Sequence, residues 1–224
     1  MKIAAIQHFS MLDYPEKMSA IIFTQGCPLR CAYCHNPDLQ QIKQETISFD
    51  EVINFLKSRI GLLEGVVFSG GEPLLQPDLY KAMLQIKNLG FYIGLHTSGY
   101  LYKKFCEVLP IVDWIGFDIK TSFKNYEQIT GVSGSGNIAE KSFLKMLEYR
   151  DKLKFEIRTT VDTRNITFNE LQEIAHFLER NSIREWILQQ CILRNKNKDD
   201  VILSLPNENE LKELRRIINI KVRS

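Results

Sequence analysis

The chain has 224 residues, of which 44% are hydrophobic and 25% are charged, and its formal net charge is +2. This composition argues against a disordered chain, and the small charge without a basic run gives no reason to expect a nucleic-acid partner. No apolar stretch approaches the ~20 residues that cross a bilayer, and residues 1–13 lack the apolar segment of a secretory signal. We therefore expect a single cytoplasmic domain over residues 1–224, without membrane attachment.

Six short apolar runs predict buried strands, because each is bounded by glycine, proline or charged residues. In chain order they cover residues 19–24, 65–69, 91–96, 114–119, 155–161 and 185–189.

Amphipathic segments between these runs predict helices. Ser48 and Glu51 occupy the two positions of a capping box, and an apolar stripe follows at helical spacing. That stripe consists of Val52, Ile53, Leu56 and Ile60. A second helix opens at Pro77 and ends at Gly90, with Leu79, Met83, Leu84 and Ile86 facing inward. Further helices are expected over residues 143–149, 171–178 and 207–218, the last with Leu211, Leu214 and Ile218 on one stripe.

Strands that alternate with helices indicate βαβ units and a parallel sheet, so the fold class is α/β. Six units within about 170 residues predict a partial (β/α)6 parallel barrel, since a full eight-fold barrel needs ~250 residues. Residues 1–18 are expected to form an N-terminal lead-in, and residues 191–224 a C-terminal loop and helix. Two loop-rich stretches stand out at residues 131–136 and 194–200, and the second is charged and expected to be mobile.

The five cysteines do not suggest a disulfide framework, because their number is odd and three of them fall within eight residues. They are Cys27, Cys31, Cys34, Cys106 and Cys191. The first three follow the first predicted strand with the spacing Cys-x3-Cys-x2-Cys, and thiolates at that spacing can converge on one centre. Three protein ligands leave one iron of a four-iron cluster open to a substrate or cofactor.

Two other interpretations of this loop remain open. The three cysteines and His35 could form a structural zinc site, although such sites usually pair two short knuckles and no second knuckle is present. The cysteines could also be buried and bind nothing, which is common in cores but unusual in a polar loop with proline and glycine.

A family resemblance becomes specific at two motifs. Cys-x3-Cys-x-aromatic-Cys after a first strand resembles the signature of the radical S-adenosylmethionine (radical SAM) superfamily. Residues 68–73, Phe-Ser-Gly-Gly-Glu-Pro, end the second predicted strand and resemble the Gly-Gly-Glu-Pro motif of that superfamily. The resemblance extends over about residues 3–190. It implies an enzyme with a 4Fe–4S cluster, whose open iron binds the amino and carboxylate groups of S-adenosylmethionine. One electron then cleaves the sulfonium, and a 5′-deoxyadenosyl radical takes a hydrogen atom from the substrate.

The resemblance also implies roles for the motif residues. Cys27, Cys31 and Cys34 become the cluster ligands. The backbone of Gly70, Gly71 and Glu72 is expected to meet the methionyl amino group, which glycine allows because it has no Cβ. The backbone around Tyr33 is expected near the adenine, whereas His35 is not assigned as an acid or base.

Polar residues at later strand ends extend this predicted site. Asp118 and Lys120 share one face of their strand, and a charged pair inside a barrel is costly unless it is matched. We expect Lys120 to bind the methionyl carboxylate, with Thr97 and Ser98 as further candidates for the same ligand. Arg158 is also expected to point inward. The alternative is that Asp118 and Lys120 merely cap a strand end.

Residues 33–37, Tyr-Cys-His-Asn-Pro, resemble the glycyl-radical-enzyme activases. Residues 10–17 resemble the lead-in of the anaerobic ribonucleoside-triphosphate reductase activating branch, with Glu16 where glycine is common. This implies a glycyl-radical enzyme as the protein substrate and a flavodoxin or ferredoxin as electron donor. Leu12, Tyr14 and Pro15 could equally be a packing lid under the barrel.

Two positions depart from the family pattern. His96 stands where formate-lyase activases carry the aspartate of a cation site, and Cys191 stands near the position of a histidine. Cys106 and Cys191 are expected to be core or wall residues. Two other functions stay open, namely a radical SAM enzyme acting on a small molecule, such as a 7-deazaguanine-forming synthase, and a non-catalytic metal-binding scaffold.

Overall fold

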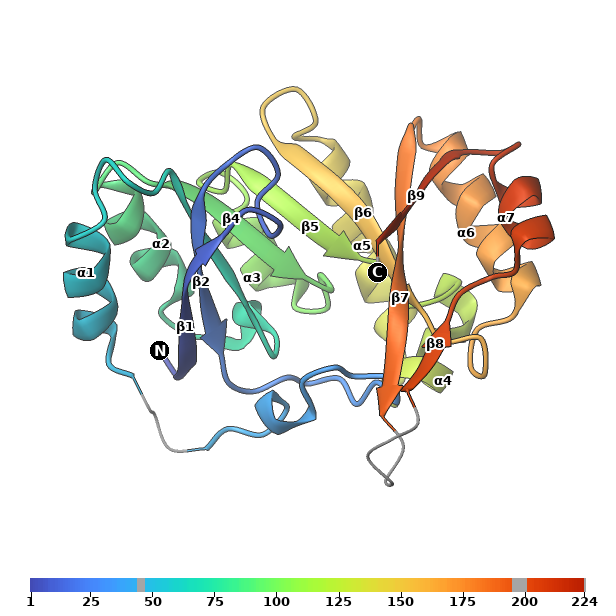
Figure 1. Cartoon of the computed structure of the whole chain (residues 1–224), viewed down its shortest axis with the longest axis horizontal. Helices are drawn as coiled ribbons and strands as arrows, with labels where there is room; N and C mark the ends of the chain where they lie inside the picture. Colours follow the sequence, from blue (N-terminus) through green and yellow to red (C-terminus); the bar gives the residue numbers. More distant parts are fainter. Residues whose placement is uncertain (44–46, 195–200, 224) are drawn as a thin grey trace. The chain divides into compact units, whose positions relative to one another are not determined.

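The computed structural model describes residues 1–43, 47–194 and 201–223 and divides into two compact units (Figure 1). The first unit contains residues 1–29, 36–116 and 138–155, and the second contains residues 30–35, 117–137 and 156–224. The expected single domain over residues 1–224 stays a prediction. Within the described ranges, no helix combines the length and apolar character that a membrane crossing requires.

The strands of the first unit begin with one that the sequence did not predict. β1 (Ile3–Ser10) pairs antiparallel with β2 (Ser19–Thr24), so the expected lead-in is largely a strand. Half of the residues of β1 are exposed and only its two terminal residues are buried, so this edge strand leaves no buried apolar run in the sequence. β2, β3 (Gly65–Gly70) and β4 (Tyr92–Thr97) are parallel neighbours, and β5 (Trp114–Asp118) begins in this unit.

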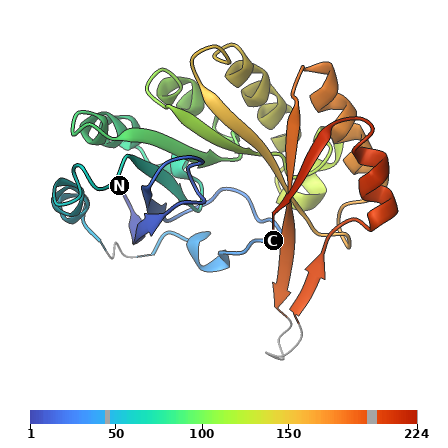
Figure 2. The same ribbon diagram turned by 45° about the horizontal axis from the view of Figure 1, so that its top comes forward.

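Helices connect these strands, and the α-helices among them lie along one face of the strands (Figure 2). They are η1 (Pro37–Leu39), α1 (Phe49–Lys57), η2 (Pro73–Leu75), α2 (Leu79–Lys87), α3 (Tyr102–Val108) and most of α5 (Ser135–Leu147). The capping box is confirmed, because Ser48 Oγ accepts from the Glu51 amide while Glu51 Oε2 accepts from the Ser48 amide. The prediction that Ile60 and Leu84 face the core is wrong, because they are 56% and 39% exposed. α1 ends before Ile60, so that residue no longer follows the helical stripe.

The second unit contains the ends of β5 and β6 (Lys154–Val161), together with η3 (Phe123–Asn125), α4 (Tyr126–Thr130) and α6 (Phe168–Arg180). β7 (Glu185–Arg194) is parallel to β6 and to β9 (Asn219–Arg223), and antiparallel to β8 (Val201–Ser204). The pairing of β9 with β7 can be followed in Figure 1.

The C-terminal prediction needs correction. Residues 191–224 are not only a loop and a helix, because they include the end of β7 and the strands β8 and β9. The terminal helix α7 (Glu208–Leu214) is shorter than predicted, and Ile218 is buried in the turn before β9. The stretch expected to be a loop at residues 131–136 contains the start of α5. Of the stretch expected to be mobile, residues 195–200 lie outside the described residues.

Tyr14 anchors the segment between β1 and β2 on the sheet. Its side chain is 3% exposed and packs against Ile21, Val67 and Trp114, with ring centroids 5.4 Å apart for the Tyr14–Trp114 pair. This confirms Tyr14 as a packing residue of the lead-in, whereas Leu12 is 76% exposed. The Lys17 amide donates to the Tyr14 carbonyl over 3.1 Å, which closes a turn with Pro15 second and Glu16 third. Glu16 has a φ of 67°, so it occupies the left-handed position that glycine favours in such turns.

Replacing Tyr14 tests this anchor. Tyr14→Ala should lower the free energy of unfolding by about 3 kcal/mol, because it removes a buried aromatic ring and leaves a cavity. Urea unfolding followed by circular dichroism measures the change. Leu12→Ala is the matched control in the same segment and should stay within about 0.5 kcal/mol of wild type. Equal effects of both substitutions would contradict the packing role of Tyr14.

Candidate cofactor-binding site

Two of the three clustered cysteines share one turn in the second unit. The Cys34 amide donates to the Cys31 carbonyl over 3.1 Å. Two contacts fix this turn, because the Arg30 amide donates to the Thr130 carbonyl over 2.8 Å and the Tyr33 hydroxyl donates to the Lys120 carbonyl over 3.3 Å. Both cysteines are free thiols of intermediate exposure. Burial raises the pKa of the Cys31 thiol, and the positive charge of Lys120 opposes that shift.

The third cysteine, Cys27, belongs to the first unit. Its amide donates to the Gln40 carbonyl over 3.1 Å, and the preceding Gly26 amide donates to the Leu39 carbonyl over 2.8 Å. Within residues 1–43, 47–194 and 201–223, no three His, Cys, Asp or Glu side chains form a group that could hold a metal ion. Three cysteine thiols that form no disulfide fit an iron–sulfur cluster in kind and in sequence spacing, and their joint ligation of one cluster stays a prediction.

The Gly-Gly-Glu-Pro segment lies against the loop that leads to Cys27. Gly70 has a φ of 116°, and a Cβ on Gly71 would lie 2.2 Å from the Gly26 carbonyl oxygen. The Gly71 amide donates to the Thr24 carbonyl over 2.9 Å, and the Glu72 amide donates to the Gly26 carbonyl over 2.8 Å. Glycine is therefore required here by backbone-to-backbone packing. A protonated amino group needs acceptors, which the carbonyl oxygens of this turn can provide.

The Glu72 side chain links the end of β3 to the end of β4. It is 2% exposed and accepts hydrogen bonds from Thr97 Oγ1 over 2.7 Å, from Ser98 Oγ over 2.6 Å and from the Ser98 amide over 3.0 Å. The Leu74 amide donates to the same carboxylate over 3.2 Å. Burial raises the pKa of Glu72, and these hydrogen bonds act against the shift. The structure thus brings Glu72, Thr97 and Ser98 together, while their roles toward a cofactor stay predictions.

His96 holds the lead-in through its imidazole. Its Nε2 lies 3.0 Å from the Asp13 carbonyl oxygen and its Nδ1 lies 3.3 Å from Ser69 Oγ. Because a carbonyl only accepts, Nε2 carries a hydrogen. The ring also meets Trp114 edge to face, with centroids 5.4 Å apart. These contacts give His96 a structural role in holding the lead-in. They explain the histidine without the cation site that the sequence analysis placed in doubt.

A charged network lies where β5 ends in the second unit, and Arg158 joins it from the middle of β6. Lys120 Nζ lies 3.2 Å from Asp118 Oδ2, and Arg158 Nε donates to Asp118 Oδ1 over 2.9 Å. The prediction that Asp118 and Lys120 share a face agrees with this contact, and Arg158 is buried as expected. Burial alone would lower the pKa of Lys120, but Asp118 and other nearby groups raise it well above its usual value. Lys120 is therefore a cation at neutral pH.

Tyr126 is a member of this site that the sequence analysis missed. Its buried hydroxyl accepts from the Lys120 amide over 2.9 Å and donates to the Asp118 carbonyl over 3.3 Å. Tyr33 contacts the Lys120 carbonyl from the cysteine turn, so two tyrosines fix the backbone on either side of the lysine. No sequence signal identifies Tyr126, because it follows Lys120 by six residues in a separate helix.

Two further residues behave as structural groups. His35 Nε2 accepts from the Ile192 amide over 3.4 Å, and burial lowers its pKa, so it stays neutral at pH 7 and is not a proton donor there. Cys191 is fully buried, and burial together with the charge of Asp162 raises its thiol pKa to about 11. Cys191 is thus a core residue, as expected.

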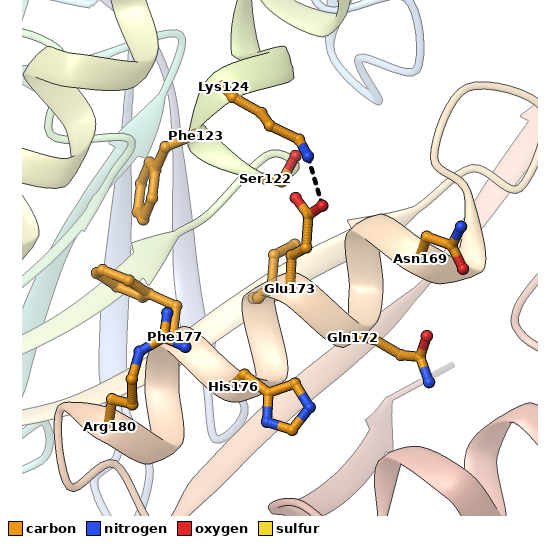
Figure 3. A pocket seen from close by; sticks show the side chains of 10 residues that line it. Ser122, Phe123, Lys124, Asn169, Gln172, Glu173, His176, Phe177 and Arg180 are labelled. Carbon is orange, nitrogen blue, oxygen red and sulfur yellow. Dashed lines mark hydrogen bonds and ion pairs between the residues drawn. The ribbon is translucent and has the colours of Figure 1, made fainter.

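A separate hollow of about 650 Å³ lies between η3 and α6 (Figure 3). Phe123 and Phe177 form one side of it, and the Lys124–Glu173 ion pair lies along another. None of the residues predicted to bind a cofactor lines this hollow. Ser122 Oγ has no hydrogen-bond partner among the described residues, but this oxygen is closed off from solvent and so cannot meet a ligand.

Removing a donor to Glu72 tests the buried carboxylate. Ser98→Ala deletes the 2.6 Å hydrogen bond and should cost about 1.5–3 kcal/mol of unfolding free energy when Glu72 is ionised. Because the lost bond favours the charged form, the deficit should grow as pH rises through the raised pKa of Glu72 and shrink below it. Urea unfolding between pH 4 and pH 8 measures this. Ser58→Ala, at the exposed end of α1, should give a deficit that does not change with pH.

Comparison with known proteins identifies the family to which this chain belongs. The family profile described as the Radical SAM superfamily matches residues 21–180. The solved structure of SuiB from Streptococcus suis superimposes with a TM-score of 0.66 at 15% identity, covering 91% of this chain and 48% of SuiB. A domain of pyruvate-formate lyase-activating enzyme from Bacteroides vulgatus gives a TM-score of 0.54 at 18% identity, covering 72% of this chain and 99% of that domain. The predicted α/β fold, a partial parallel barrel of the radical SAM type, is confirmed by this shared fold.

Relatives in sequence have more specific names. A protein of Methanocaldococcus jannaschii named as a glycyl-radical enzyme activating enzyme is 27% identical over 96% of this chain and 90% of its own length. The pyruvate formate-lyase-activating enzyme of Clostridium pasteurianum is 34% identical over 66% of this chain and 63% of its own length. Because the family profile covers well over half of the sequence, the chain belongs to the radical SAM superfamily and is an enzyme of that superfamily related to glycyl-radical enzyme activating enzymes.

Proposed function

We propose that this protein binds a 4Fe–4S cluster and S-adenosylmethionine and activates a glycyl-radical enzyme. The observation that carries the proposal is the match along 96% of the chain to a protein named as a glycyl-radical enzyme activating enzyme. The sequence Tyr33-Cys-His-Asn-Pro37, which resembles this class, supports it. The chain spans 63% of the clostridial relative and 48% of SuiB, so the activity and substrate of those longer proteins are proposed for this chain and not assumed.

The thiols, the lysine and the backbone carbonyl oxygens of the candidate site suit both cofactors. Bound together, the cluster and S-adenosylmethionine supply a radical that can abstract a hydrogen atom. Cys27, Cys31 and Cys34 would hold the cluster. Lys120, whose charged side chain is only 16% exposed, would bind the carboxylate of S-adenosylmethionine, and the carbonyl oxygens of the turn at Gly70 and Gly71 would accept from its amino group.

The remaining predicted residues would shape this site without taking part in bond cleavage. Glu72 orders the turn through Thr97 and Ser98, and Arg158 neutralises Asp118. Tyr33 fixes the cysteine turn next to Lys120. The protein would thus orient the cofactor and exclude water around it.

We infer a more specific partner from the lead-in. Residues 10–17 resemble the branch that activates anaerobic ribonucleoside-triphosphate reductase, and the position of Glu16 has the backbone conformation that the glycine of that branch would favour. The substrate would then be a backbone glycine of such a reductase, with a flavodoxin or ferredoxin as the electron donor in the cytoplasm. Relatives named for pyruvate formate-lyase make that enzyme the alternative partner to test.

The cluster is tested by anaerobic reconstitution. Wild-type protein should take up roughly four irons and four sulfides per chain, the stoichiometry of this cluster type. Cys31→Ala should lose the brown absorbance and the release of 5′-deoxyadenosine after reduction. Cys106→Ala removes a cysteine outside the motif and should keep both. Stoichiometric zinc without sulfide would instead support the metal-binding scaffold.

Glycine activation is tested by electron spin resonance. Reduced, reconstituted protein and S-adenosylmethionine should produce a doublet glycyl signal in anaerobic ribonucleoside-triphosphate reductase and none in pyruvate formate-lyase. A signal in the lyase alone would keep glycyl-radical activation but reject the reductase. Release of 5′-deoxyadenosine without a glycyl signal in either partner, together with turnover of a small molecule, would reject the proposal.

A further inference from the structure

The charged network around Lys120 extends to the C-terminal strand β9. Arg223 donates two hydrogen bonds to Glu156, one from Nη1 to Oε1 over 2.9 Å and one from Nη2 to Oε2 over 3.1 Å. Arg158 Nη1 lies 3.8 Å from Glu156 Oε1, and its Nε donates to Asp118. Five side chains of alternating charge thus connect β9 through β6 to the lysine at the end of β5. In order they are Arg223, Glu156, Arg158, Asp118 and Lys120.

Most of this chain of charges is shielded from water. The side chains of Arg158, Glu156 and Lys120 are 6%, 12% and 16% exposed, whereas those of Asp118 and Arg223 are 25% and 35% exposed. In such surroundings an unpaired charge is costly, so removing one member redistributes the others. The five side chains comprise three cations and two carboxylates and therefore have a net charge of +1.

The two oxygens of Asp118 have different partners. Oδ1 accepts from Arg158, whereas Oδ2 faces Lys120. If Lys120 turns toward a ligand carboxylate, Asp118 keeps its ion pair with Arg158. Arg158 in turn stays with Asp118 only while Glu156 does not draw it away, and the bidentate contact with Arg223 satisfies Glu156.

We propose that Arg223 and Glu156 are positioning residues that keep Arg158 on Asp118 and so leave Lys120 available for the carboxylate of S-adenosylmethionine. This proposal rests on the proposed cofactor but not on the identity of the glycyl-radical partner. It assigns a function to β9, a strand that the sequence analysis did not predict. Neither residue needs to touch the cofactor, because both act through Arg158.

The test measures the dissociation constant of S-adenosylmethionine on anaerobically reconstituted protein by equilibrium dialysis. Arg223→Gln should weaken binding roughly three- to tenfold, the range expected when charge coupling within a network is lost. Iron content should not change. Arg223→Lys keeps the charge but loses the bidentate geometry, so it should recover part of the affinity.

Lys221→Gln is the matched control. Lys221 lies on the same strand and forms an ion pair with Glu185 over 2.9 Å, but it belongs to an exposed pair outside the network. Its substitution should leave the dissociation constant within about twofold of wild type. A loss of affinity as large as that of Arg223→Gln would show a general effect of β9 and would overturn the proposal.

A double-mutant cycle distinguishes positioning from packing. If Arg223 acts through Lys120, then Arg223→Gln should have little further effect in a Lys120→Met background. Equal losses in both backgrounds would overturn the proposal, as would wild-type affinity in Arg223→Gln. Should Lys120→Met bind S-adenosylmethionine too weakly to measure, Glu156→Gln replaces it as the background. The double variant with Arg223→Gln should then have the same affinity as Glu156→Gln alone.

Absence of a glycyl signal with intact cofactor binding would reject the proposed partner and leave this inference standing.

Discussion

Two carboxylates that are wholly or largely removed from water, Glu72 after β3 and Asp118 at the end of β5, impose the constraint on which the rest of the site depends. A carboxylate removed from water must find donors or cations, or it costs several kcal/mol. Glu72 meets this requirement with hydroxyl and amide donors from β4 and the residue after it, and Asp118 meets it with Lys120 and Arg158. Glu72 therefore ties the turn after β3 to the end of β4, and Asp118 ties the end of β5 to β6.

The two carboxylates use different chemistry, which suits different tasks. Burial raises the pKa of Glu72, and its neutral hydrogen-bond donors offset only part of that shift. Its main effect is to fix the turn at Gly70 and Gly71. Asp118 is paired with cations, and one of them, Lys120, has its pKa raised well above its usual value. A cation that is largely removed from water suits an anionic group of a ligand.

The lead-in joins the sheet through its own set of contacts. Tyr14 packs on Ile21, Val67 and Trp114, and the carbonyl of Asp13 binds His96. The left-handed backbone at Glu16 carries the strain of a side chain where glycine would be relaxed, a cost typically of order 1 kcal/mol or more. The surrounding contacts are therefore strong enough to hold this turn in place.

Six of the strands, the capping box at Ser48 and the resemblance to a family could be predicted from the sequence alone, because periodicity, turn residues and the cysteine spacing are local patterns. The sequence also placed Asp118 and Lys120 on one face, since side chains alternate along a strand. Only the tertiary structure revealed β1, β8 and β9, Tyr126, and the link from Glu156 to Arg223. Glu156 stands two residues before Arg158 and was within reach of the same alternation rule, but Arg223 lies 67 positions further along the chain. Contacts at that separation depend on which strands pair, and pairing is decided by packing between distant segments that no local pattern records.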